Sequence, residues 1–196
     1  YLFSLPTLTV FTTYLQFFVV LTALFVAFVY FRVIIEKAFK NQINPDGTVA
    51  RPDFRRLLRQ VKNRAYTHIA ILISLFFVLI AVKNYLSQFS IVYSTQGAVV
   101  GAGYTDINVV LPILKALMIA AALIAILFIA WTVARKVFEK KHILLYSMLG
   151  YFILAFIGLS ILPFLVQELR VSPNELTLEK EYISHNINYT QFAYGL

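Results

Sequence analysis

The chain has 196 residues, of which 60% are hydrophobic and only 13% are charged. Soluble globular domains carry about one quarter charged residues, so this composition excludes that class and indicates one compact membrane domain. A net charge of +8 would suggest nucleic-acid binding in a soluble protein, but here its distribution is more informative, and the absence of cysteine excludes disulfides and thiolate metal sites.

Four apolar runs exceed the roughly 18 residues that a bilayer-spanning helix requires. We expect spans at about 8–31, 66–86, 109–134 and 142–166. They predict an all-α membrane fold, a bundle of four transmembrane helices that forms one module over residues 1–166. The first residue is Tyr1, and no basic start or small-residue cleavage site precedes the first run. We therefore expect the chain to be a piece of a longer protein.

The connection between the first two spans, residues 32–65, is strongly basic. In its second half, apolar residues recur at i, i+3, i+4 and i+7, which is one face of a helix. The remaining faces carry four cations: Arg55, Arg56, Arg59 and Lys62. A basic amphipathic helix is typical of a membrane surface, where each cation near an anionic leaflet contributes roughly 1 kcal/mol. We predict a separate interfacial helix whose cations contact lipid head groups; an acidic partner or nucleic acid is the alternative.

Residues 87–108, between the second and third spans, are neither apolar enough to cross a membrane nor strongly charged. They contain three glycines and a polar stretch: Gly97, Gly101, Gly103, Tyr104, Thr105 and Asp106. Glycine permits tight turns, and Thr105 or Asp106 is suited to cap the next helix, with Pro112 tolerated in its first turns. We expect an ordered loop that caps a helix. The alternative is a re-entrant segment, in which the residues from Gly101 to Asp106 form an interaction site or a pathway.

Lys115 lies one to two turns inside the third span. A lysine at the centre of a spanning helix costs about 2.5–3.5 kcal/mol and less near its end, so snorkelling to the interface is the expected explanation. Pairing with Asp106 or lining a polar cavity is the alternative. Lys115 is therefore included among the possible pathway residues.

Small residues in the third and fourth spans predict close helix packing, because they let neighbouring backbones approach in lipid. In the third span they recur at i, i+4: Ala116 with Ala120, Ala121 with Ala125, and Ala130 with Ala134. In the fourth span they include Gly150 and Gly158. Pro163 is expected near the end of this span, where a lost hydrogen bond matters least.

The tail, residues 167–196, is polar. Ser172-Pro173-Asn174-Glu175 matches a capping box, and Gly195 is a suitable C-cap. The apolar residues between them have roughly helical spacing: Leu176, Ile183, Ile187 and Tyr194. A helix of about 20 residues with nothing to bury against is marginal. We expect it to dock on a domain or partner outside this chain, as an extracytoplasmic lead-in to a further outer domain.

Charge asymmetry predicts the orientation. Alternation of the spans places the connections 32–65 and 135–141 on one side, where nine and four cations make 13 of the 17. Short loops rich in Lys and Arg stay in the cytoplasm. The sequence thus predicts a multi-pass plasma-membrane protein with anionic lipids at its cytoplasmic face, and with both ends of this chain outside the cytoplasm.

Three stretches together resemble a known family. They are residues 1–6 (Tyr-Leu-Phe-Ser-Leu-Pro), residues 101–108 with Leu111-Pro112, and a set in the tail: Pro173, Glu175, Glu179, Tyr182, Ile183, Asn186, Ile187, Thr190, Ala193, Tyr194, Gly195 and Leu196. Over its whole length the chain resembles the bacterial and archaeal multi-spanning membrane proteins of uncharacterised protein family number 0182. The resemblance implies an internal fragment, with further spans before it and a large extracytoplasmic domain after it. It implies no activity, because the function of that family is not established.

The sequence lacks a nucleophile elbow, a zinc-protease helix and a phosphate-binding Gly-Lys loop. Glu181 and His185 stand at i, i+4, but two ligands without a third are more typical of a surface ion pair than of a metal site. We predict no catalytic residue, no metal or other cofactor and no nucleic-acid partner.

The main hypothesis is an anchoring or interaction module, with other membrane or extracytoplasmic protein domains as partners. A transporter or channel component using Lys115 and the Gly-rich loop is the alternative, and an accessory subunit of a membrane complex is a third.

Overall fold

The computed structural model describes residues 4–40, 54–97, 99–134 and 142–195. Within these ranges the backbone is helical except for a loop at 94–103 and a few residues at helix ends, and no strand occurs. This part of the chain contains four helices long and apolar enough to cross a membrane: Ser4–Glu36, Arg64–Tyr93, Asp106–Val133 and His142–Leu178. The predicted all-α fold with four candidate spans is confirmed.

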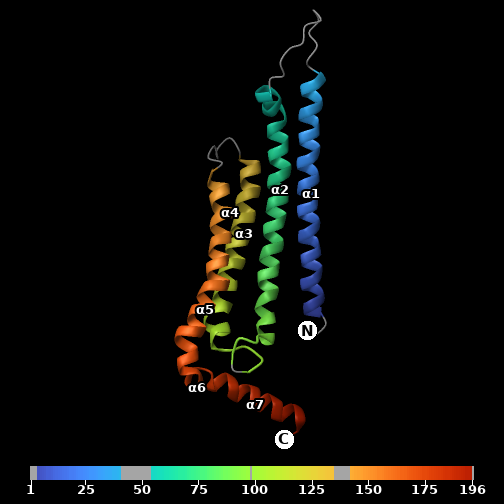
Figure 1. Ribbon diagram of the computed structural model, residues 1–196. Helices are drawn as coiled ribbons and strands as arrows, with labels where there is room; N and C mark the ends of the chain where they lie inside the picture. The colour runs from blue at the N-terminus through green and yellow to red at the C-terminus, as the bar shows by residue number, and fades with distance from the viewer. Residues whose placement is uncertain (1–3, 41–53, 98, 135–141, 196) are drawn as a thin grey trace, which may run out of the picture.

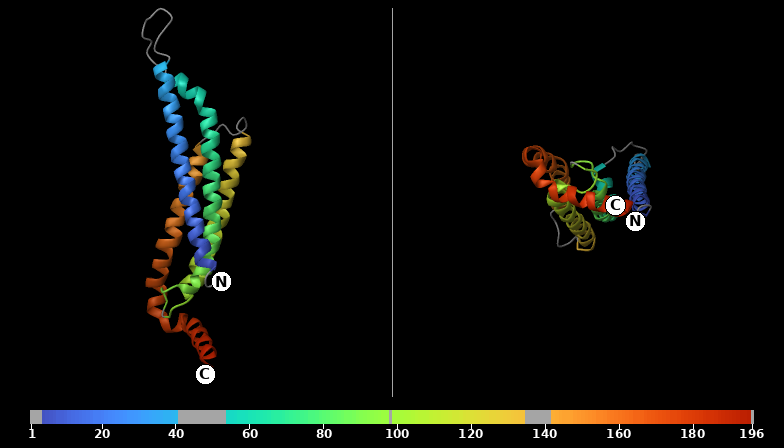
Figure 2. Two further views of the ribbon diagram at one scale, coloured as in Figure 1. Left: turned by 90° about the vertical axis from the view of Figure 1, so that its right-hand side faces the viewer. Right: turned by 90° about the horizontal axis from the view of Figure 1, so that it is seen from below.

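The long helices lie side by side, with α2 between α1 and α3 (Figures 1 and 2). They are α1 (Ser4–Lys40), α2 (Phe54–Ser90), α3 (Leu111–Val133) and α4 (His142–Phe156). α1 packs against α2, α2 also packs against α3, and α3 packs against α4. We call the end at which α1 ends and α2 begins the basic end, after the basic connections that the sequence has there. The opposite end, where η1 (Ile91–Tyr93) and the last helices lie, is the tail end.

The predicted interfacial helix is not a separate element. α2 begins at Phe54 and continues without a break to Ser90, so the amphipathic segment and the second span form one helix of 37 residues. At 1.5 Å per residue this helix is about 55 Å long, which exceeds the roughly 30 Å hydrocarbon core of a bilayer. The side chains of Arg55, Arg56, Arg59 and Lys62 lie outside the described residues, as do the connections 41–53 and 135–141. Their contact with lipid head groups stays a prediction.

Aromatic contacts and side-chain hydrogen bonds join α2 to α3 and α4. The fully buried Phe77 ring stacks on Phe128 of α3 and meets the edge of Tyr151 of α4, with ring centroids 6.4 Å and 5.4 Å apart. The Ser74 hydroxyl donates to the backbone carbonyl of Ala125 at 2.9 Å, and the Asn84 amide donates to the Tyr151 hydroxyl at 2.8 Å. Such bonds tie helices together where water is absent.

The small-residue prediction is confirmed in part. Ala121 and Ala125 are buried in the core, and the bond from Ser74 to the Ala125 carbonyl requires the two backbones to be close. Gly158 packs against Ile113 of α3, since a Cβ added to it would lie 2.8 Å from Ile113 Cγ2. Gly150 has no neighbouring atom within 4 Å of such a Cβ, so it is not a contact point among the described residues.

Three π-helical segments each precede a proline by the same interval. They are η2 (Asp106–Val110), η3 (Ile157–Ile161) and η4 (Gln167–Val171), followed two residues later by Pro112, Pro163 and Pro173. A proline ring clashes with the carbonyl four residues before it. In each case that carbonyl belongs to the central residue of the π-helical segment, and the wider turn makes room for the ring.

The π-helical turns explain why the fourth helix is longer than predicted. Pro163 was expected near the end of the span, but the helix continues through η3, α5 (Leu162–Val166) and η4 to Val171. The predicted end at 166 was too early, and the π-helical turn before Pro163 accommodates the proline ring inside the helix.

The tail folds back across the tail end of the bundle (Figure 1). It consists of η5 (Ser172–Asn174), α6 (Glu175–Leu178) and α7 (Lys180–Tyr194). Gly195 has φ 69°, and its N–H bonds the Phe192 carbonyl, which confirms the predicted C-cap.

The predicted start of the tail helix is wrong. Ser172 lies inside a 3-10 turn and makes no capping hydrogen bond, and the expected single helix is divided at Glu179. The predicted apolar face is also not the protected one, since Leu176, Ile187 and Tyr194 are all more than half exposed.

Candidate functional site

The Gly-rich loop closes on itself before the third span begins. The Gly101 N–H donates to the Ser94 carbonyl at 2.8 Å, and Gly101 has φ 141°, a conformation that L-residues rarely adopt. Helical backbone resumes at Tyr104. Gly103 therefore occupies the N-cap position of the third span, and a glycine has no side chain with which to cap it.

Asp106 supplies half of the cap. Its Oδ2 accepts the Gly103 N–H at 3.2 Å, and the side chain is buried. An acidic residue three positions after the cap that bonds back to the cap N–H is the reciprocal half of a capping box. Of the two predicted capping residues, Asp106 is thus the one that caps. The Thr105 hydroxyl bonds Gln167 Oε1 at 2.6 Å instead, which joins the start of the third span to η4.

Glu179 supplies a second capping contact from 75 positions away in the sequence, at the first N–H of the helix. Its Oε1 accepts the Tyr104 N–H at 3.0 Å, and its side chain is only 1% exposed. A Cβ added to Gly103 would lie 3.1 and 3.2 Å from the two Glu179 oxygens. The carboxylate thus occupies the place of a capping side chain at residue 103, where the free N–H groups and the helix dipole favour negative charge.

The carboxylate also lies beside a second glycine of the loop. A Cβ at Gly97 would lie 3.5 and 3.6 Å from the Glu179 oxygens, which is ordinary van der Waals contact. Glu179 Oε2 is buried and has no hydrogen-bond partner in the part of the chain that the structure describes. The bond from Tyr104 is therefore the principal polar contact that fixes the carboxylate.

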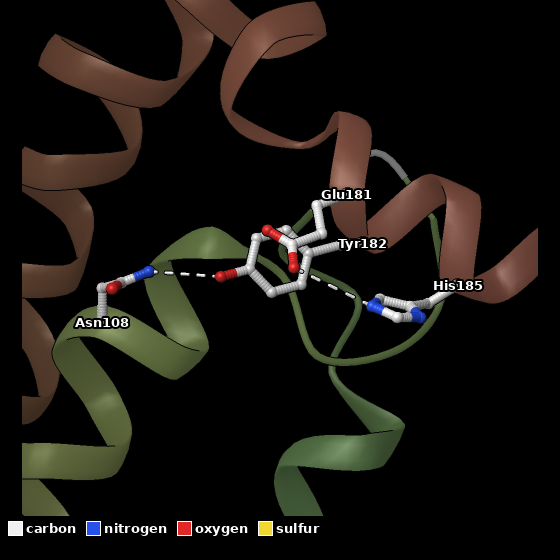
Figure 3. Close-up of polar contacts among 4 residues, drawn as sticks. All are labelled: Asn108, Glu181, Tyr182 and His185. Atoms are coloured by element: carbon white, nitrogen blue, oxygen red, sulfur yellow. Dashed lines mark hydrogen bonds and ion pairs between the residues drawn. The ribbon is translucent and has the colours of Figure 1, made fainter.

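Further polar contacts hold α7 against the loop. The Asn186 amide donates to the Val100 carbonyl at 2.9 Å, and the Asn108 amide donates to the Tyr182 hydroxyl at 3.3 Å. Figure 3 shows Tyr182 reaching from α7 toward Asn108 at the start of the third span. The Arg170 guanidinium lies over the Tyr104 ring, 5.6 Å from its centroid, in a cation–π contact. α7 thus docks on this chain's own loop. A further partner outside the chain remains a hypothesis.

Glu181 and His185 form the exposed pair that Figure 3 also shows. Their Oε1 and Nε2 atoms are 3.9 Å apart, and both side chains are more than 60% exposed. This is the geometry of a surface ion pair, which contributes little to stability. The described residues contain no group of three or more His, Cys, Asp or Glu side chains that is placed to hold a metal ion.

The structure brings together all but one of the predicted interaction or pathway residues. Gly101, Gly103, Tyr104 and Asp106 belong to the place where the Gly-rich loop and the start of the third span meet the tail, which we call the junction. Lys115 has an exposed side chain on α3. Two cavities flank the junction, one of 550 Å³ between α7 and the loop and one of 360 Å³ lined by Gln96, Ser160, Gln167 and Glu168 among others. Lys115 lines neither cavity.

Sequence reasoning named Glu179 only in the tail set that carries the family resemblance, and it assigned this residue no role. Glu179 lies in a polar tail among other acidic residues, and no spacing rule links it to a glycine 76 positions earlier. The sequence contains one local indication of this contact. Glycine at the cap position has no side chain to cap the helix, so Asp106 alone leaves the helix end half capped. We call the contact of Glu179 with Gly97, Gly103 and Tyr104 the carboxylate latch.

Comparison with known proteins gives one consistent result. The model of a family described as "Uncharacterised protein family (UPF0182)" matches residues 1–196. A UPF0182 protein of Trichlorobacter lovleyi is 35% identical over 198 residues, which cover 100% of this chain and 20% of that protein. UPF0182 proteins of Methanospirillum hungatei and Paenarthrobacter aurescens are 37% and 39% identical over 64% and 67% of this chain, and 13% of each relative is covered. No solved structure matches the chain.

Proposed function

Because the chain belongs to the uncharacterised protein family UPF0182 and spans about one fifth of the length of a relative that it matches throughout, we propose that it is the membrane anchor of a longer protein. In this proposal the four spans hold α7, and the part of the protein that follows it, in a fixed orientation to the bilayer. The anchor acts by binding and positioning and takes no part in catalysis.

The carboxylate latch is the observation that carries this proposal. A charged side chain buried to 1% exposure between two chain segments holds them in one relative position, because any displacement leaves the carboxylate and the Tyr104 N–H without their partner. The bonds from Asn186 to the loop and from Asn108 to Tyr182 act in the same direction. A tail that only tethered the next domain would need none of these contacts.

The distribution of cations supports an orientation for the anchor. The basic connections 32–65 and 135–141 join helices at the same end of the bundle, and the 13 cations that they carry favour the cytoplasmic side. We propose that the basic end faces the cytoplasm, where Arg55, Arg56, Arg59 and Lys62 meet anionic lipid, and that α7 lies outside.

The anchoring proposal is tested by measuring the distance between α7 and the bundle in the full-length protein. Nitroxide labels at Ser184→Cys on α7 and Ile119→Cys on α3 occupy exposed positions away from the latch. We expect electron–electron double resonance in lipid vesicles to give one narrow distance distribution. A reference pair at Ile119 and Leu154, both exposed within the spans, shows the width of a rigid pair. A broad distribution for the α7 pair beside a narrow reference would refute the fixed orientation.

The orientation is tested separately by labelling introduced cysteines in intact cells. With a membrane-impermeant thiol reagent, we expect Lys180→Cys to be labelled and Gln60→Cys to be labelled only after the cells are opened. Because this chain contains no cysteine, the background comes only from the rest of the protein and can be removed by substitution. Labelling of Gln60→Cys in intact cells, with Lys180→Cys silent, would reverse the proposed orientation.

A further inference from the structure

The buried face of the fourth helix changes its spacing where the π-helical turns occur. Between residues 142 and 171 the buried residues are Leu144, Tyr151, Gly158, Pro163 and Val171. The first three are seven positions apart, which is close to two turns of an α-helix. The next two intervals are five and eight positions, one more than the four and seven that keep a residue on the same helix face. η3 contains Gly158, at the start of the first longer interval, and η4 lies within the second.

A continuous α-helix would turn the later residues away from the bundle. Such a helix advances about 100° per residue, so the 13 steps from Gly158 to Val171 would place Val171 about 220° from Gly158 around the axis. A π-helical turn holds one extra residue. When two extra residues are subtracted, 11 steps remain, and Val171 lies within about 20° of the direction of Gly158. The two π-helical turns thus keep both residues on one face.

The contacts on this face follow the third span to its start. Gly158 packs against Ile113, and α5 packs against η2. Gln167 Oε1 accepts the Thr105 hydroxyl at 2.6 Å, and Val171 is fully buried. The fourth helix therefore stays against the third span up to the residue at which the tail begins.

We propose that η3 and η4 are a positioning device for the carboxylate latch. Together they supply a rotation of about 200° that a continuous α-helix over the same residues would lack. This rotation directs the tail across the bundle with Glu179 at Gly103. Each turn is followed by a proline, which disfavours a regular α-helical turn at that place. The proposal deepens the anchoring function and rests on it through the latch, because it names the residues that set the direction of the anchor's last helix.

Removing the extra residue of η3 from the full-length protein tests the proposal. Deletion of Ser160, which is exposed, shortens η3 to an α-helical turn and rotates the following residues by about 100°. Pro163→Ala is present in every variant and in the reference protein, so that no proline ring clashes with the shortened turn. We expect the deletion to raise hydrogen exchange in a peptide covering 99–108 about 30-fold, as loss of the latch would.

A compensating insertion separates rotation from general damage. An alanine inserted between Leu165 and Val166 adds one residue and restores the direction of everything that follows it. We expect the insertion alone to open the junction, and the insertion combined with the deletion to return exchange to within about threefold of the reference. Peptides covering 64–86, in the second span, report whether the bundle stays folded.

The outcomes distinguish this proposal from the function on which it rests. Unchanged exchange at 99–108 in the deletion variant, or equally fast exchange in the deletion and in the combined variant, would overturn the positioning role alone. If the deletion variant does not fold, the combined variant decides, since the proposal requires it to fold and to protect 99–108. Fast exchange at 99–108 in the wild-type protein would instead refute the latch, and the anchoring function with it.

Discussion

Glu179→Ala is expected to open the junction between the loop and the tail, and to raise the hydrogen-exchange rate of the Tyr104 amide about 30-fold. The substitution removes a buried, charge-assisted hydrogen bond and a helix cap, which together contribute about 2 kcal/mol, and 1.4 kcal/mol is a factor of ten. Exchange followed by mass spectrometry on the full-length protein, in peptides that cover 99–108 and 180–194, measures this change.

Two variants establish that the effect comes from the carboxylate latch. Glu181→Ala changes an 81% exposed neighbour and is expected to leave exchange at residues 99–108 unaltered. Gly103→Ala places a methyl group 3.1 Å from a Glu179 oxygen and is expected to loosen the same peptides. In the Glu179→Ala background this methyl group finds free space, so Gly103→Ala adds little there. If Glu179→Ala leaves the exchange of both peptides within twofold of the wild type, the latch does not hold the junction.

Gly158→Val is expected to destabilise the contact between the third and fourth spans by about 1–3 kcal/mol, the usual cost of adding bulk to a close-packed site. The first added carbon would lie 2.8 Å from Ile113 Cγ2, closer than such atoms approach in proteins. Reversible unfolding of the reconstituted full-length protein in a detergent titration measures the loss.

The second glycine of the fourth span provides the control for this prediction. Gly150→Val adds the same side chain where no atom lies within 4 Å, and we expect no loss of stability. Adding Ile113→Ala to Gly158→Val removes the atom that clashes and is expected to restore part of the stability. Equal losses for Gly150→Val and Gly158→Val would show that glycine flexibility, and not contact with Ile113, determines the result.

The spans were predictable because hydropathy depends on local composition alone. The third span was expected at 109–134 and is found at Asp106–Val133, a difference of a few residues at each end. The capping role of Asp106 was also accessible, since its partner is three residues away. The C-cap at Gly195 was predictable for a similar reason, because glycine itself permits the backbone conformation that a C-cap requires.

Other features depend on parts of the chain that are distant in sequence or on helix continuity. The amphipathic residues after Phe54 were correctly expected to be helical, but nothing between Val61 and Tyr66 ends a helix, and the segment joins the span. Pro163 was expected near the end of a fourth span at 142–166, but the helix continues well past it, because rules based on single residues do not anticipate a π-helical turn before the proline. Glu179 acquires its role only when the fold brings it to a glycine that lacks the side chain needed for capping.

The carboxylate latch also imposes an order on the assembly of the chain during translation. Glu179 follows Tyr104 by 75 residues, so at about 5–20 residues per second the ribosome adds it roughly 4–15 s later. Until then the third helix has an incomplete cap, and the space beside Gly103 is empty. The latch can close only after the whole fourth helix has been made. A product that stops before residue 179 would therefore lack the carboxylate that completes this cap.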